Sequence, residues 1–209
     1  MLLKKIVEDV TEWVDENICE GLQLKLPDDY KNDNNYDVVF VRPAAFPLFP
    51  PGTDRLPPGV AAPIPSISVQ LMEGTDHTLQ NSRQLSIRLC IACWNPGIHS
   101  DAKFYPTVDE DAEYGYHYNL GNDGVEQSYE RNIDGWKDAF NLLDRTISKL
   151  ENTEFIAGCR IDHAEGIKYG MFTEEGKIWD YYPYWHSYVS FKLDCGTGAI
   201  LPDAYKDLL

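Results

Sequence analysis

Apolar residues recur at helical spacing in two segments of the chain. In residues 2–20 they return every three or four positions with acidic residues between them, and Gly21 follows where a C-terminal glycine cap belongs. Residues 134–151 repeat this pattern, and Asp134 stands at the N-cap position. Each segment therefore predicts an amphipathic helix with one buried face. The stripe predicted for the second helix consists of Trp136, Phe140, Leu143, Ile147 and Leu150.

Alternation of apolar and polar residues marks the strands. Residues 66–73 and 83–94 alternate along their length, so each predicts a strand with one face in the core. The short connection between them predicts that the two strands pair antiparallel. Shorter strands are predicted at 37–41, 155–162, 164–172 and 187–193, with a proline-interrupted strand or edge at 178–185.

The order of these elements indicates the fold class. A helix, a group of strands, a second helix and a second group of strands follow one another. Two helices on one face of a sheet bury both apolar stripes with the fewest elements. We therefore predict a single α+β domain over residues 1–209, with two layers, a mostly antiparallel sheet and long inserted loops.

Two stretches interrupt the periodic pattern. Residues 43–65 hold eight of the 13 prolines, which disfavour helix and interior strand, so we predict a long loop. Residues 99–130 are acidic and rich in tyrosine, without sustained periodicity. Loops of this length usually carry function or contact a neighbour. Apolar residues here and in the C-terminal aromatic run are the predicted contact residues, namely Phe46, Phe49, Leu56, Tyr114, Tyr116, Tyr118 and Trp185.

The charge of the chain limits its partners. The net charge is −16, with 34 acidic against 18 basic residues. Such a chain repels nucleic acid and anionic membrane, although DNA can pass it without adhering. No apolar run approaches the roughly 20 residues that cross a bilayer, and acidic residues break the N-terminal helix, unlike a signal peptide. We therefore expect no membrane partner and five reduced cysteines.

The candidate reactive groups favour structural roles. Cys90 and Cys93 have the spacing of a zinc or redox pair, but in an alternating strand they point to opposite faces, as core cysteines do. The triplet around His163 is better explained as a strand-end turn than as a metal or acid–base site. The acidic run 109–113 lacks the order of a calcium-binding loop. We therefore expect no catalytic residues, no metal and no cofactor, and a protein that is not an enzyme.

A dense aromatic run lies near the C-terminus, and two interpretations of it stay open. A nucleic-acid stacking surface needs interleaved cations, and only Lys177 and Lys192 are near. Such rings suit a core combined with a subunit interface, or stacking against a carbohydrate. The run comprises Trp179, Tyr181, Tyr182, Tyr184, Trp185 and Tyr188.

About half of the chain resembles the tail-terminator, or tail-completion, proteins of long-tailed bacteriophages and phage-tail-like particles. The similar pieces are LLKKIVEDVTEWV, ISVQLME, RQLSIRLCIACW, GWKDAFNLLDRTISKL and GIKYGMFTEEGKIWDYYPYWHSYVSFKL. The stretches 43–65 and 99–130 are larger than that family's minimal fold. The family has no catalytic residues to transfer.

The resemblance implies a function in virion assembly. It implies a homohexameric ring that caps the tail tube, stops its polymerisation and presents a surface to the head or collar. Expected partners are further copies of the chain, tube and possibly sheath proteins, and a head–tail connector, with DNA passing through the lumen. The expected location is the virion tail, contractile or not, after assembly in the bacterial cytoplasm. A head–tail joining protein is the nearest alternative, and a carbohydrate-binding module is a more distant one.

Overall fold

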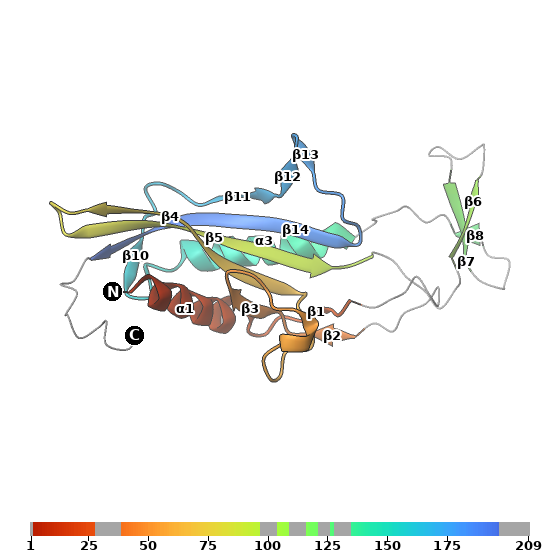
Figure 1. Ribbon diagram of the computed structural model, residues 1–209. Helices are drawn as coiled ribbons and strands as arrows, with labels where there is room; N and C mark the ends of the chain where they lie inside the picture. Colours follow the sequence, from red (N-terminus) through yellow and green to blue (C-terminus); the bar gives the residue numbers. More distant parts are fainter. Residues whose placement is uncertain are drawn as a thin grey trace.

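The computed structural model describes residues 2–27, 39–96, 104–108, 116–120, 126–127 and 135–196. Three features of the sequence analysis lie outside these residues: the helix cap Asp134, the acidic run 109–113 and the contact candidate Tyr114. Figure 1 shows a long curved sheet with two helices beside it.

The first predicted helix is confirmed. Helix α1 (Leu3–Val14) continues into a π-helical stretch, Asp15–Cys19, and Gly21 follows with a left-handed φ of 72°. Glycine suits this position because it lacks the Cβ that makes a positive φ costly. The buried face consists of Ile6, Val7, Val10, Val14 and Ile18.

The second helix forms as predicted, but it is rotated relative to the predicted stripe. Helix α3 (Gly135–Glu151) buries Gly135 and Ala139 in its first turns, where the sequence analysis placed Trp136 and Phe140. These two rings are exposed and contact each other edge to face, with centroids 5.3 Å apart. Because Gly135 and Ala139 are small, the start of α3 can approach the sheet closely. The larger rings of Trp136 and Phe140 then lie on the exposed side of the helix.

The main sheet has seven strands. The central ones are β4 (Ser66–His77), β5 (Ser82–Trp94) and β14 (Tyr184–Gly196), which pair antiparallel. Their order is β3-β4-β5-β14-β10-β9, and β11 also pairs with β14. The outer strands are β3 (Ala44–Pro47), β9 (Phe155–Ile156), β10 (Cys159–Ile161) and β11 (Lys168–Met171). Among the strands that the structure describes, only the β3–β4 pairing is parallel, so the predicted largely antiparallel α+β fold is confirmed.

The remaining described strands form small sheets. One joins β1 (Leu24–Lys25) and β2 (Phe40–Val41), and β12 (Thr173–Glu174) and β13 (Lys177–Ile178) form a short hairpin. A three-stranded sheet contains β6 (Phe104–Val108), β7 (Tyr116–Leu120) and β8 (Glu126–Gln127).

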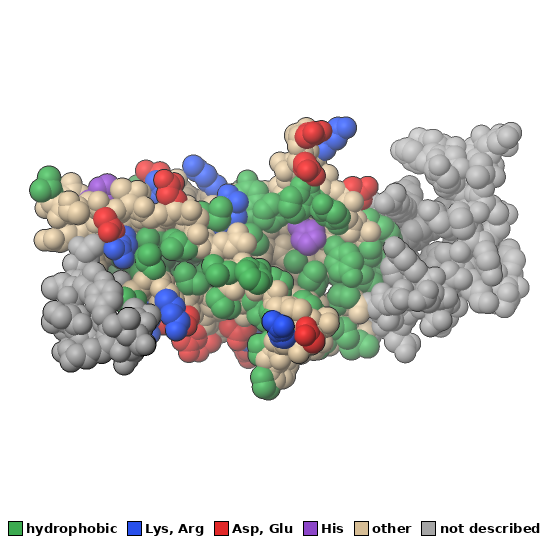
Figure 2. Space-filling model, viewed as in Figure 1, with side chains coloured by type: hydrophobic (Ala, Val, Ile, Leu, Met, Phe, Trp, Pro, Cys, Tyr) green, Lys and Arg blue, Asp and Glu red, His purple; other side chains and the backbone are tan. Residues whose placement is uncertain are grey.

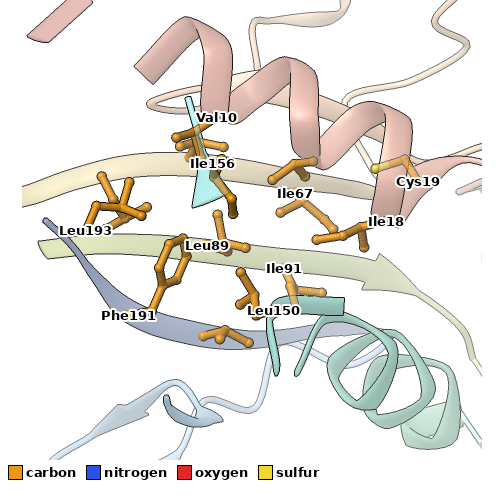
Figure 3. Close-up of a cluster of buried hydrophobic side chains, with 14 of the residues drawn as sticks. Val10, Ile18, Cys19, Ile67, Leu89, Ile91, Leu150, Ile156, Phe191 and Leu193 are labelled. Carbon is orange, nitrogen blue, oxygen red and sulfur yellow. The ribbon is translucent and has the colours of Figure 1, made fainter. Parts of the chain in front are cut away.

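One hydrophobic core lies between the helices and the sheet (Figure 3). Alternate residues of β5 and β14 enter this core together with buried residues of α1 and α3, so both helices cover the same face. This confirms the alternation predicted for β5. The core residues of the two strands are Leu85, Ile87, Leu89, Ile91, Cys93, Val189, Phe191, Leu193 and Cys195.

Short strands lie within both interrupted stretches. Within 43–65, β3 pairs with the start of β4, and the Leu48 amide continues the contact by donating to the Val69 carbonyl (2.8 Å). Proline is tolerated here because an edge strand hydrogen-bonds on one side only. Within 99–130, the described residues form the short strands β6, β7 and β8. Strands of two to five residues are too short to produce a recognisable period.

Candidate interaction surfaces

The sheet has an outer face, turned away from the helices, that carries much of the chain's aromatic surface. The strand register places Phe46 beside Ser68, Ser68 beside Cys90, Cys90 beside Tyr188, and Tyr188 beside Gly170. These residues form one row across β3, β4, β5, β14 and β11. Because side chains alternate along each strand, their neighbours two positions away share this face.

An aromatic cluster covers the β11 end of that row. Phe172 stacks on Trp179 with centroids 5.1 Å apart and contacts Tyr188 at 5.4 Å. Trp179 also meets Tyr181 edge to face at 5.5 Å, and His186 lies 6.3 Å from Trp179. We call these five residues the outer aromatic cluster. Figure 2 shows hydrophobic side chains gathered below the β12–β13 hairpin, around a histidine.

The hairpin holds the cluster in place while part of it stays exposed. The Trp179 amide donates to the Phe172 carbonyl (3.0 Å), which closes the β12–β13 hairpin over β14. At the other end, the Arg88 guanidinium lies 5.3 Å from the centre of the Tyr188 ring, a cation–π distance. Trp179 is 38% exposed and Tyr181 is 53% exposed. The cluster thus presents ordered rings to solvent.

His186 makes the stability of this region depend on pH. Burial lowers the pKa of His186 below its ordinary value of 6.5. The unfolded chain therefore binds this proton at a higher pH than the folded protein. We expect the free energy of unfolding to fall as the pH is lowered through 6.5 towards the folded-state pKa.

Urea unfolding at several pH values between about 8 and 5 measures this effect, with the ordinary histidine pKa in the middle of the range. His186→Gln should flatten the acid-side loss, whereas His77→Gln, at the exposed end of β4, controls for replacing a histidine. Parallel curves for the wild type and His186→Gln would contradict the assignment.

The predicted contact residues of the proline-rich stretch divide into buried and exposed positions. Phe46 is 3% exposed, which corrects its prediction as a contact residue. Leu56 is partly exposed. Leu48 is 50% exposed and Phe49 70%, and we call this pair the edge knob. Leu48 adopts a left-handed φ of 65°, and the Phe49 amide donates to the Pro47 carbonyl (2.8 Å), so a tight turn directs Phe49 outward.

Trp185 lies on the inner side of the sheet and is half-buried, so its role as a contact residue stays a prediction. It pairs in register with Cys93, whose side chain enters the core, and its ring packs against the core cluster. Its indole Nε1 donates to the Asn95 carbonyl (2.8 Å). Alternation along β14 puts Trp185 on the face opposite His186 and Tyr188. The remaining candidates, Tyr116 and Tyr118, lie in β7.

Asn95 joins four elements at the end of β5. Its side chain is 4% exposed, donates to Asp138 Oδ2 (2.6 Å) and accepts from Lys25 Nζ (2.8 Å). Its amide donates to the Pro183 carbonyl (3.0 Å). Burial lowers the pKa of Lys25, and the nearby Asp138 carboxylate opposes this shift. Nothing in the sequence pattern pointed to this network, which fixes the end of β5.

The described reactive groups occupy structural positions. Cys93 is buried and Cys90 half-buried, on opposite faces as predicted. The Asp162 carboxylate accepts from the amides of Ala164 (3.1 Å) and Glu165 (3.3 Å), which makes the predicted turn beside His163. Among the residues the structure describes, no three His, Cys, Asp or Glu side chains are grouped closely enough to hold a metal ion.

Two cysteines depart from the prediction of free thiols. Cys159 and Cys195 form a disulfide, while Cys19, Cys90 and Cys93 are free. Strand β10 pairs with β14 so that Arg160 lies opposite Asp194, and this register brings the two cysteines together. The prediction was wrong because residues 36 positions apart become neighbours only through strand pairing.

Comparison with known proteins gives no relative: no family model, no curated protein and no solved structure matches the chain. Neither helix in the described part of the chain combines the length and apolar character needed to cross a bilayer.

Proposed function

We propose that this protein is a structural assembly protein, a ring-forming subunit that closes the end of a phage-type tail tube. The observation that carries the proposal is the apolar surface left exposed at two separate edges of the sheet. These residues are Leu48 and Phe49 on one side, and Tyr169, Ile178, Trp179 and Tyr181 on the other. Large exposed apolar patches are typical of surfaces that bind other proteins, and aromatic residues are enriched there.

The charge of the chain supports the same function. A net charge of −16 multiplies in a ring of identical copies, so the lumen repels the phosphate backbone. DNA then passes through without specific binding. The proposed partners are further copies of the chain, tube and sheath proteins, and a connector or collar, in the virion tail. The protein uses no catalytic residue and no cofactor in this role.

Experiments can distinguish two alternative functions from this proposal. A head–tail joining protein would use the same surfaces and differ only in its partners. A carbohydrate-binding module is favoured by the exposed rings of Trp179 and Tyr181, which are suited to stacking on a sugar. Glycan binding that is lost in Trp179→Ala while self-assembly persists would support the module.

The oligomeric state tests the proposal directly. We expect light scattering after size exclusion to give several times the 23.8 kDa subunit mass. Negative-stain images should show closed rings alone and rings at the ends of purified tail tubes. A monomer at every concentration, with no binding to tube ends, would overturn the proposal.

A further inference from the structure

His186 is a titratable side chain that the proposed function leaves without a role. It lies half-buried on the outer face of β14, and its ring centre is 6.0 Å from that of Tyr181 and 6.3 Å from that of Trp179. In the part of the chain that the structure describes, the imidazole makes no hydrogen bond and no ion pair. These surroundings suit the neutral ring, because a charge there loses hydration without gaining a partner.

The segment that covers His186 is held to the sheet by few contacts. Residues 172–181, which we call the hairpin segment, contain β12 and β13, and these strands pair through two exposed residues each. One end is held where the Phe172 amide donates to the His186 carbonyl (3.3 Å), and the other where the Tyr184 amide donates to the Tyr181 carbonyl (2.8 Å). Between these ends, the rings supply the contact with β14. A two-stranded hairpin is at best marginally stable alone, so the ring contacts decide whether the segment stays closed.

We propose that protonation of His186 releases the hairpin segment from the outer face of the sheet while the core stays folded. The imidazolium charge needs hydration, and water reaches the ring when Trp179 and Tyr181 move away. Release therefore disperses the outer aromatic cluster, so acid removes its ordered rings from this face. Figure 2 shows a histidine surrounded by hydrophobic side chains below the hairpin. The device is separate from the proposed function and does not depend on it.

The strands around His186 bring no negative charge to it in the described register. Burial raises the pKa of Cys90, which keeps that thiol neutral. Arg88, which lies 5.3 Å from the centre of the Tyr188 ring, and Lys168, opposite Ser190, carry positive charge further along the same face. Both oppose a further cation at His186. The other neighbours on this face are Ala92 of β5, Ser66 of β4, Gly170 of β11, and Tyr184 and Tyr188 of β14.

The hairpin segment carries its charges at the surface. Water and salt screen such groups, so they act on His186 less than its burial does. Trp179 and Tyr181 offer the imidazolium a cation–π attraction, but the net effect follows burial, which lowers the pKa of His186 below its ordinary value of 6.5. The closed segment thus binds the proton more weakly than the open one, and acid favours opening. The surface charges of the segment are Glu174, Glu175, Lys177 and Asp180, all exposed.

Amide hydrogen exchange of the full chain at several pH values measures the release. The Phe172 and Trp179 amides are hydrogen-bonded in the closed segment and report its opening. After correction for the intrinsic effect of pH on exchange, opening should increase several-fold on going to pH 5. The increase is at most about thirtyfold, the limit for one histidine of ordinary pKa that is neutral in the closed form.

Low urea concentrations separate local release from global unfolding. Exchange of the Trp179 amide should hardly respond to urea, because releasing the hairpin segment exposes little surface. Exchange of the amides in the Leu89–Val189 pair, at the centre of the sheet, should rise steeply with urea. If the Trp179 amide instead exchanges at the same rate and with the same urea dependence as this pair, the segment opens only with the whole domain and the proposal is wrong.

Two matched variants assign the response to one histidine. His186→Gln cannot take up the charge, so opening of its hairpin segment should not change between about pH 8 and pH 5, on either side of the ordinary histidine pKa. His77→Gln, at the exposed end of β4, should respond to acid as the wild type does. An acid response that persists in His186→Gln would overturn the proposal. If that variant does not fold, NMR titration of the wild-type imidazole decides, because a pKa of His186 at or above 6.5 would equally overturn it.

Discussion

Replacing Phe191 with alanine is expected to lower the free energy of unfolding by about 3–5 kcal/mol, the range for deleting a buried aromatic ring. Phe191 is 2% exposed and lies in the middle of β14, opposite Ile87 of β5. Its ring enters the core that both helices cover (Figure 3). The close-packed neighbours can fill only part of the space it leaves. A loss of this size is a large share of the roughly 5–15 kcal/mol that stabilises a typical domain.

The matched control makes the same chemical change on the surface. Phe49→Ala removes an identical ring that is 70% exposed, so the change in unfolding free energy is expected to stay within about 0.5 kcal/mol. Urea unfolding of both variants in dilute, unassembled protein gives the comparison. Equal losses at the two positions would mean that β14 does not lie at the centre of the core.

Removing the disulfide is expected to cost about 3–4 kcal/mol of unfolding free energy. Cys159 and Cys195 are 36 positions apart, and crosslinking a loop of that length restricts the unfolded chain by roughly this amount. The bond also fastens the short strand β10 to the end of β14, where the register pairs only Arg160 and Ile161. Cys159→Ala/Cys195→Ala should therefore unfold at lower urea concentration than the oxidised wild type.

Two measurements accompany this variant. Wild type in reductant should unfold like the double variant, and Cys90→Ser, which leaves the disulfide in place, should stay within about 1 kcal/mol of the oxidised protein. Thiol titration of the denatured oxidised chain should find three reactive groups, those of Cys19, Cys90 and Cys93. Five reactive thiols, with no effect of reductant, would show that the two cysteines stay reduced.

The regular elements were predictable because their signal is local. Burial every three or four residues in α1 and every two residues in β5 follows from backbone geometry alone, so the alternation from Leu85 to Cys93 identified its own buried face. The same local rule placed Cys90 and Cys93 on opposite faces. It failed for α3, where burying Gly135 and Ala139 in place of Trp136 depends on how closely the helix approaches the sheet.

The candidate surfaces were predictable only in part. Proline density and apolar content drew attention to the stretch that contains Phe49, yet the same criteria selected Phe46, which β3 buries. The aromatic run near the C-terminus was evident, but its composition could not separate Trp185 from the exposed Trp179. That distinction depends on the β14–β5 register, which turns Trp185 inward, and on the stacking of Trp179 against Phe172 outside β14.

By itself, the sequence determined two amphipathic helices, the β4–β5 pair, the α+β class and a strongly acidic chain, because each depends on neighbouring residues or on a simple sum of charges. Only the tertiary structure decided which ends of the sheet carry exposed rings, that β3 joins β4 in parallel, and that Cys159 meets Cys195. These features depend on pairing between segments distant in sequence, and no local periodicity records which strands become neighbours.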